Sequence, residues 1–421
     1  MEDKALKPPC WEFASSIIDW SAAKHDICVL NENGGVIATT VVPHTADGLL
    51  KLEALRQKLG VAPAECLVGI ETAHTLVIDF LWARDYSHIY VIPPNVVKST
   101  RGRYRQSGAR TDTSDALLVA DLLRTDLARL HPWRPDSLLT HQLRNRVGLV
   151  SHLTQTAVRL SNRLYAVLMR YYGAGLTIFS GLQTQIALQF LLAYPTPTAA
   201  DALTFAQFKT FATEQHYPHP HKLAAAFARL KDAHPVSTAQ TITVFEAEMQ
   251  QLAQLLLEVV QAKRSQVREL QDLFMQHSDY AIFASLPGAG DILAPALLTK
   301  FGDDRQRFPN AESVQALAGT CPVTEQSGKR RVISFRTACD HDFRAIVQQW
   351  AKASLKHSAW AQAYWQQTRP QCRSDSHGYR CLGNRWLAIA WKLWQTHTPY
   401  DEAYHLQQRL KRQQPRPAEH Q

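Results

Sequence analysis

The order of short apolar runs at the start of the chain restricts the fold more than any other feature. Strands are expected at residues 16–20, 26–30, 36–42, 66–70 and 88–92. Helices are expected at residues 45–59, 75–85 and 113–125. Asn33-Gly34-Gly35 is a strong hairpin signal between the second and third strands. Three strands followed by alternating helix and strand predict a mixed α/β sheet with helices packed on it.

The middle of the chain is expected to be helical. Residues 139–172 have an apolar pattern with interspersed arginines, and prolines break up residues 176–240. A heptad seam then runs through Phe245, Met249, Leu252, Leu256 and Val259, and it resumes out of phase at Val267. The seam predicts a short coiled coil or helical hairpin, formed within one chain or between chains. A plain amphipathic helix packed on its own domain fits the pattern as well.

Four regions follow from these patterns. Residues 1–135 have the element order of an RNase H-like fold, the fold of the RuvC resolvase, and residues 136–277 form a helical and coiled-coil linker region. Residues 278–405 form a mostly α C-terminal domain of short helices and Gly/Pro turns. The basic tail, residues 406–421, is expected to be disordered.

Composition narrows the class of protein. The formal net charge of +9 favours acidic partners, of which nucleic acid is the commonest, although a solvated basic surface would look the same. The seven cysteines are odd in number, widely spaced and without a CxxC motif, so neither a disulfide framework nor a zinc site is expected. The polar N-terminus does not read as a signal peptide, and the sequence has no uncharged apolar run of membrane-spanning length. A cytoplasmic protein without a membrane partner is expected.

Four carboxylates occupy positions that such a sheet would bring together. Asp19 interrupts an apolar strand, Glu71 follows another strand, and Asp112 and Asp115 open a helix three residues apart. A carboxylate on a buried strand is costly unless it is paired. Mg²⁺ prefers such oxygen ligands, and two ions can activate a nucleophile and stabilise the leaving oxygen of a phosphodiester. Each acid alone has an ordinary structural explanation, so the hypothesis rests on the set.

A run of cations lies between the second and third of these acids. It comprises Lys98, Arg101, Arg103, Arg105 and Arg110. A flexible basic loop beside an acidic metal site is predicted to bind the phosphate backbone without reading sequence. The alternative is a solvated loop.

Two glycines near residue 290 suggest a second contact with DNA. Gly288 and Gly290 lie in a turn just before a helix, as in the hairpin of a helix-hairpin-helix element. The free N–H groups at a helix start bind phosphate well. A plain Pro-Gly turn is the competing interpretation.

Ser327 is the candidate nucleophile. It lies in a glycine-containing loop and precedes three cations, Lys329, Arg330 and Arg331. A serine hydroxyl needs a base, a metal or nearby positive charge to become reactive, and the cations could hold the target phosphate. Out of context, Ser-Gly is a common loop dipeptide.

Together these residues resemble the DEDD transposases of the insertion sequence 110 family, relatives of the pilin-gene invertase. The four acids match the family acids in order and approximate spacing, and the segments after residue 280 resemble the family's C-terminal transposase domain. The resembling positions there are Leu286–Gly290, Gly302, Asp303, Phe308, Ala318, Gly319, Pro322 and Gln326–Gly328.

The resemblance implies an enzyme that excises and inserts its own mobile element. Ser327 would form a covalent phosphoserine link with DNA, later reversed by a DNA hydroxyl. The four acids would be catalytic and would hold Mg²⁺. The resemblance also implies a homotetramer in which the acids of one subunit meet the serine of another. Some family members use a non-coding guide RNA from the element, which pairs with donor and target DNA.

Two other functions remain open. A metal-dependent nuclease or junction resolvase on the same fold would use water as its nucleophile. A non-enzymatic nucleic-acid-binding protein would not need the acids at all. Two further groups have structural explanations: a proline-stiffened polar loop for His216, His219 and His221, and helix packing for Trp386, Trp391 and Trp394.

Overall fold

The computed structural model describes residues 10–14, 24–70, 76–92, 94–100, 102, 112–232, 237–328 and 330–413. For residues 10–14, 94–95, 112–113 and 411–413 it describes the backbone alone. The chain divides into two compact units, residues 1–135 and 136–421. In the described part of the chain, no helix is long and apolar enough to span a membrane.

The first unit is built on a five-stranded sheet in the order β3-β2-β1-β4-β5. Its strands are β1 (Cys10–Ala14), β2 (Lys24–Leu30), β3 (Val36–Pro43), β4 (Leu67–Ile70) and β5 (His88–Val91). Strand β2 pairs antiparallel with β1 and β3, whereas β1, β4 and β5 run parallel. The predicted mixed α/β sheet is therefore confirmed, with the strands in the predicted sequence order.

The helices of the first unit cover both faces of this sheet. They are α1 (Ala46–Lys58), α2 (Leu76–Trp82), α3 (Pro94–Thr100) and α4 (Asp112–Asp126), with short 3₁₀ turns at Pro63–Glu65 and Leu127–Arg129. Along β2, Ile27 and Val29 pack into one core with α1 and α2, while Cys28 packs with Ala116 and Ala120 of α4. Successive residues of a strand face opposite sides, which explains why β2 reads as a continuous apolar run.

Strand β1 at Cys10–Ala14 was not predicted, and the strand predicted at residues 16–20 lies outside the described residues. One expectation for this unit needs correction. The predicted basic loop begins as helix α3, because Pro94 suits the first turn of a helix. The Ser99 and Thr100 hydroxyls donate back to the Val96 carbonyl within that helix.

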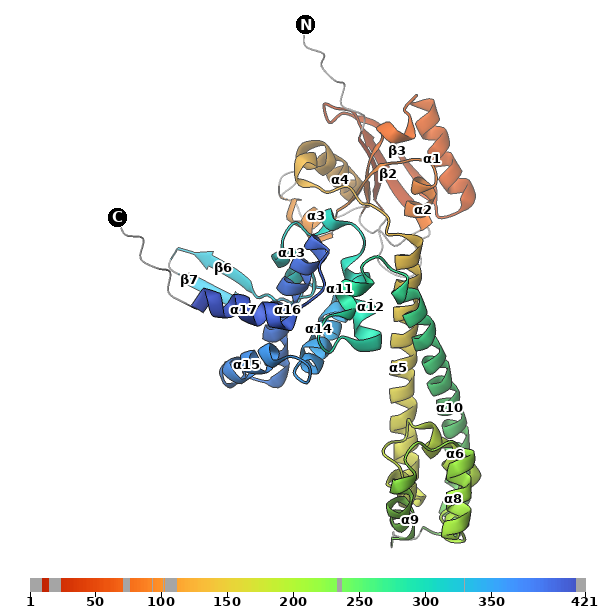
Figure 1. Cartoon of the computed structure of the whole chain (residues 1–421). Helices are drawn as coiled ribbons and strands as arrows, with labels where there is room; N and C mark the ends of the chain where they lie inside the picture. Colours follow the sequence, from red (N-terminus) through yellow and green to blue (C-terminus); the bar gives the residue numbers. More distant parts are fainter. Residues whose placement is uncertain are drawn as a thin grey trace, which may run out of the picture. The chain divides into compact units, whose positions relative to one another are not determined.

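The second unit contains a long antiparallel helical hairpin of α5 (Leu138–Tyr171) and α10 (Ala239–Met275), which lie side by side in Figure 1. Ion pairs between Arg146 and Glu269 (2.8 Å) and between Arg163 and Glu248 (2.5 Å) connect the two helices at two levels. Pairing within one chain, one of the predicted options, is thus confirmed for the heptad seam.

A small helical cluster caps the far end of this hairpin. It comprises α6 (Gln185–Ala193), α7 (Pro197–Asp201), α8 (Phe205–Glu214) and α9 (Leu223–Lys231), with 3₁₀ turns at Gly173–Leu176 and Pro220–Lys222. Pro197 and Pro220 open their helical turns, where the missing N–H has no helical partner to lose. The prolines therefore divide this region into short helices.

The C-terminal part packs around a core rich in tryptophan. Its elements are α11 (Tyr280–Ala284), α12 (Gly290–Phe301), a 3₁₀ turn at Arg305–Arg307, α13 (Ala311–Leu317), β6 (Val323–Ser327), β7 (Arg330–Ser334), α14 (His341–Ser354), α15 (Ala359–Thr368), a 3₁₀ turn at Arg369–Gln371, α16 (Asp375–Thr396) and α17 (Glu402–Gln413). Trp386 and Trp394 are fully buried, and the Trp391 indole donates to the Phe308 carbonyl at 2.9 Å, as expected of packing residues. The expected disordered tail is helical to Gln413, and residues 414–421 lie outside the described part. The Glu402 carboxylate accepts from the Ser358 hydroxyl and from the Tyr400 hydroxyl, and these hydrogen bonds hold the start of this last helix in place.

Candidate active site

Strands β1 and β4 end side by side at one edge of the sheet. They are parallel neighbours, and Phe13 lies opposite Ile70, the last residue of β4. Glu71 follows Ile70 directly, and Asp19 follows β1 in the chain. Both acids are outside the described residues, but the strands that precede them in the chain, β1 and β4, end at the same edge of the sheet.

Helix α4 begins near that same edge. It packs against β1, β2 and β4, and a Cβ on Gly34, in the turn between β2 and β3, would lie 3.2 Å from Nε of Arg124 in its last turn. Arg124 thus marks the end of the sheet that carries the β2–β3 turn. Asp115 precedes Arg124 by about 13 Å along the helix, at 1.5 Å per residue. Asp115 therefore lies toward the other end of the sheet, where β1 and β4 end. Asp115 is buried, with 5% of its surface exposed, and the backbone of Asp112 forms the first residue of the helix.

The sequence analysis overlooked another buried carboxylate at this edge. Asp26, 4% exposed, pairs in register with Ala14, the last residue of β1. Strand alternation turns it toward α4, as it does Cys28, and Lys24 lies 3.7 Å from its carboxylate. The signal in the sequence was an acid at the start of an apolar run, directly before Ile27–Leu30.

Next to it, His25 faces the other side of the strand and is fully buried. Its Nε2 lies 2.8 Å from Nδ1 of His44, and burial, followed by the neighbouring His44, lowers the pKa of His25. This histidine pair belongs to the packing of β2 and β3. It is not part of the carboxylate edge, the edge of the sheet at which β1 and β4 end.

The predicted phosphate-binding run is described only at its start. Lys98 is exposed on α3, where its ammonium can reach solvent and an incoming phosphate. Arg101, Arg103, Arg105 and Arg110 lie outside the described residues.

Ser327 lies in the second unit, at the tip of a β-hairpin. It is the last residue of β6 and pairs with Arg330, the first residue of β7. The sequence predicted Ser327 in a loop, and that prediction is wrong because the residue belongs to a strand. A two-residue turn, with Gly328 at φ +56°, closes the hairpin, and Lys329 is outside the described residues. Ser327, Arg330 and Arg331 are exposed. Ser327 and Arg330 lie opposite each other on one face of the tip, and Arg331 faces the other side.

The base of this hairpin is held by aromatic contacts. The guanidinium groups of Arg344 and Arg380 lie 4.5 and 4.6 Å from the centre of the Phe335 ring, just beyond β7. Every residue of β7 is exposed, including Val332 and Ile333. The hairpin is thus anchored at one end and open to a partner along its length.

The two glycines of the predicted DNA-binding turn play different parts. Gly288 has φ +74°, and a Cβ there would lie 2.6 Å from the backbone of Ala353 and Ser354, so close packing on α14 accounts for this glycine. Gly290 has φ +54°, is exposed, and begins α12 with open space around its Cα. Of the two, Gly290 has the geometry for approach by a phosphate.

Gly302 and Asp303 join α12 to the base of the helical hairpin. A Cβ on Gly302, at φ +75°, would lie 2.6 Å from Oδ1 of Asp136. Asp303 accepts from the Ser137 N–H at 2.5 Å and from the Thr140 hydroxyl at 2.7 Å, and lies 3.1 Å from Nε2 of His277. Burial alone would raise the pKa of Asp303, but these hydrogen bonds outweigh it and hold the pKa below its usual range. These two positions are therefore structural.

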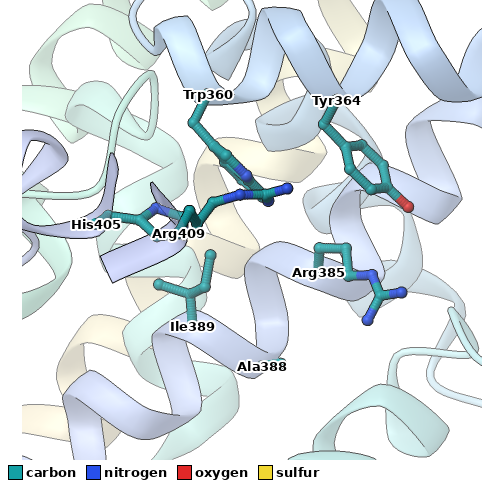
Figure 2. A pocket seen from close by; sticks show the side chains of 7 residues that line it. All are labelled: Trp360, Tyr364, Arg385, Ala388, Ile389, His405 and Arg409. Atoms are coloured by element: carbon teal, nitrogen blue, oxygen red, sulfur yellow. The ribbon is translucent and has the colours of Figure 1, made fainter. Parts of the chain in front are cut away.

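The C-terminal part also has a pocket of about 420 Å³, formed between α15, α16 and α17 (Figure 2). Trp360 and Tyr364 come from α15, Arg385 from α16, and His405 and Arg409 from α17. Aromatic rings with two guanidinium groups suit a planar anionic ligand such as a nucleotide.

The described residues contain one group with metal-ligand chemistry, Cys372, His377 and Cys381, which the sequence analysis missed. Among the described residues, His216, His219 and His221 are not part of such a group. The group could not be recognised from sequence spacing, because its ligands come from a turn and a helix and do not form a CxxC motif.

The five-stranded mixed sheet of the first unit is consistent with an RNase H-like fold, and comparison with known proteins gives the class of the protein. A transposase family profile for DEDD enzymes of IS110 matches residues 18–173, and a profile described as the IS116/IS110/IS902 transposase family matches residues 280–366. Together they cover more than half of the chain. The protein is a transposase, an enzyme that cuts and rejoins DNA.

Comparison with individual relatives identifies the family of the chain. It is 28% identical over 408 residues to the mini-circle protein of Streptomyces coelicolor named as the candidate transposase for IS117, covering 93% of this chain and 97% of the relative. It is 24% identical over 400 residues to the 42 kDa protein of insertion element IS900 from Mycobacterium paratuberculosis, covering 92% and 96%. It is 27% identical over 320 residues to the 44.8 kDa protein of IS116 from Streptomyces clavuligerus, covering 74% and 77%. The chain belongs to the IS110 family of insertion-sequence transposases.

Proposed function

We propose that this transposase cuts and rejoins DNA through a covalent bond to Ser327, assisted by the acids Asp19, Glu71, Asp112 and Asp115. The observation that carries the proposal is the convergence of three chain segments at one sheet edge. Strands β1 and β4 end there side by side, and α4, which begins toward this edge, packs against both strands. Asp115 is buried at this position.

The donor chemistry at this edge fits Mg²⁺. The proposed ligands, Asp19, Glu71, Asp112 and Asp115, all offer hard carboxylate oxygens, which Mg²⁺ prefers together with water and phosphate oxygens. A bound Mg²⁺ would neutralise charge on the phosphodiester and favour the ionised form of an attacking hydroxyl. The family to which the chain belongs supports a requirement for a divalent metal.

The reaction that we propose for Ser327 is an exchange of phosphate esters. Its Oγ forms a bond to phosphorus, one P–O bond of the DNA backbone breaks, and the proton lost by the serine ends on the departing DNA hydroxyl. A hydroxyl of a second DNA end later attacks the phosphoserine, which restores the serine and completes the new strand. The total number of phosphoester bonds is unchanged, so the exchange needs no external energy source.

The exposed hairpin tip supports this role. Arg330 lies opposite Ser327 in the hairpin register, and Arg331 follows it. Together with Lys329 they would hold the target phosphate and the negative charge that develops on it. Lys98, Arg101, Arg103, Arg105 and Arg110 would bind the DNA backbone near the acids, and Gly290 would admit a phosphate to the start of α12.

We further propose that the acids of one subunit meet the serine of another in a homotetramer, and that a non-coding guide RNA selects the DNA sites. The acids and the serine belong to different compact units of the chain. The net charge of +9 suits an RNA and a DNA partner.

The alternative is a nuclease or resolvase on the same fold, with water as the nucleophile. The exposed position of Ser327 favours the serine, because a hydroxyl at a hairpin tip can enter the active site of a second subunit.

A covalent-adduct assay separates the two. Purified protein is mixed with Mg²⁺, labelled DNA carrying the element ends, and RNA transcribed from the flanking element, and products are resolved on a denaturing gel. Wild type should give a protein–DNA adduct, and Ser327→Ala should give neither adduct nor cleavage. The matched control is Ser334→Ala, at the open end of the same hairpin, which should retain both. Cleavage by Ser327→Ala at the wild-type rate would establish water as the nucleophile.

A further inference from the structure

The C-terminal part contains a cluster of two thiols and an imidazole. One ligand atom from each of Cys372, His377 and Cys381 lies within 4.8 Å of the others. His377 and Cys381 are four residues apart on α16, so they share one face of the helix. Cys372 comes from the turn before the helix, and each residue is partly buried.

Local hydrogen bonds hold the turn in the position that brings Cys372 to the helix. The Cys372 N–H donates to the Arg369 carbonyl at 3.0 Å, and Nη1 of Arg369 donates to the Cys372 carbonyl at 3.1 Å. Arg369 also pairs with Asp375 at 2.5 Å in the first turn of α16. Ser374 caps this helix by accepting from the His377 N–H at 3.2 Å. The three donors are thus placed by the fold before any ion is bound.

We propose that Cys372, His377 and Cys381 bind one zinc ion, with water in the fourth position. Thiolate sulfur and imidazole nitrogen are the ligands that Zn²⁺ takes in proteins, usually in a tetrahedron. The hard ion Mg²⁺ prefers oxygen, so this cluster and the carboxylate edge of the first unit select different metals.

The charges around the cluster agree with this assignment. Binding of Zn²⁺ releases the two thiol protons, and the two thiolates then balance the charge of the ion. Arg373 and Arg380 flank the ligands in sequence, and such cations stabilise thiolates. A Zn²⁺ ion bound by two thiolates has no net charge. Beside Arg373 and Arg380 such a neutral unit is more favourable than an uncompensated metal cation.

The zinc would secure the corner between α15 and α16. In this corner the Trp365 ring stacks on Tyr379, with centroids 4.5 Å apart and an interplanar angle of 15°. A Cβ on Gly378 would lie 2.7 Å from Trp365, so the two helices are already in close contact beside the cluster. Since α16 also carries the buried Trp386 and Trp394, the ion would stabilise the helix that organises the C-terminal core.

Metal content and cobalt spectroscopy of the full chain test the proposal without any measurement of DNA cleavage. Protein purified under reducing conditions should retain about one zinc ion per chain by elemental mass spectrometry, the occupancy of a single site. After removal of zinc by a chelator, Co²⁺ should produce an intense near-ultraviolet thiolate-to-cobalt band, which carboxylate-bound cobalt does not give. Both signals should be lost in Cys381→Ser and His377→Gln. They should persist in Cys321→Ser, a partly buried cysteine outside the cluster.

Several results would overturn the zinc site. One is a wild-type chain that takes up no zinc and gives no thiolate band while its circular dichroism shows a folded protein. A second is equal loss of zinc in Cys321→Ser and Cys381→Ser. A third is a Cys372–Cys381 disulfide in freshly purified protein that does not bind zinc after reduction.

Discussion

Replacing Asp303 with alanine should lower the free energy of unfolding of the second unit by about 3 kcal/mol. The carboxylate joins the N-terminus of α5 to the end of α10, because it accepts from the Ser137 N–H and the Thr140 hydroxyl and contacts the His277 ring. The Thr140 hydroxyl and the His277 ring are buried, and a buried polar group that loses its partner costs about 1–3 kcal/mol. The two groups also lie 2.9 Å from each other, so part of the loss is recovered between them.

The same network predicts a dependence on pH. The hydrogen bonds lower the pKa of Asp303 in the folded state, so its stabilising contribution is fully present above the ordinary aspartate pKa of about 3.9. That contribution is lost as the pH falls from there toward the lower pKa of the folded state. The difference between wild type and Asp303→Ala should therefore be constant near neutral pH and shrink below about pH 4.

Urea denaturation followed by tryptophan fluorescence measures this difference, because Trp394 belongs to the same core as α5, α10 and α12. Asp303→Asn should lose less than the alanine variant, because an amide oxygen can still accept one of the bonds. Asp272→Asn, an exposed acid on α10, should change stability by no more than about 0.5 kcal/mol. An Asp303→Ala chain as stable as the Asp272→Asn control at pH 7 would refute the reasoning.

Three further predictions use the same logic. Gly288→Ala should destabilise the second unit by about 3 kcal/mol in urea, whereas Gly290→Ala should cost about 1 kcal/mol. Backbone strain applies to both variants, but the clash with α14 applies only to Gly288. Equal losses of stability would contradict the packing role of Gly288. Leu256→Ala should destabilise the helical hairpin by about 2–5 kcal/mol, seen as a lower midpoint in far-ultraviolet circular dichroism, since this side chain is fully buried in the heptad seam; an unchanged midpoint would argue against the seam. Asp115→Asn should slow DNA cleavage about 100-fold or more without unfolding the protein, while Asp126→Asn at the other end of α4 should cleave normally; normal cleavage by Asp115→Asn would remove it from the proposed acid set.

Local patterns were sufficient for most individual elements. The apolar run of β2, the turn after it and the Thr45-capped helix α1 follow from residue alternation, glycine content and a side-chain cap, all of which act within a few residues. The heptad spacing likewise predicted α10 and its paired seam. In each case the determining contacts are close in sequence, so the sequence alone is informative.

Contacts between distant segments decided what the sequence left open. The central strand β1 was not predicted, and its pairing with β2 and β4 places it in the middle of the sheet. The tail expected to be disordered became α17, because Glu402 accepts from Ser358 across the C-terminal core.

The candidate sites divide in the same way. The sequence alone supplied the residues proposed to carry the chemistry, which are the acids Asp19, Glu71, Asp112 and Asp115, and Ser327 with its following cations. Only the tertiary structure turned Asp26 toward the carboxylate edge, placed Ser327 at the tip of a hairpin, and brought Cys372 to the ligands on α16. The physical reason is that chemical identity belongs to each residue separately, whereas a binding site is a distance between residues, and sheet pairing and helix packing set that distance.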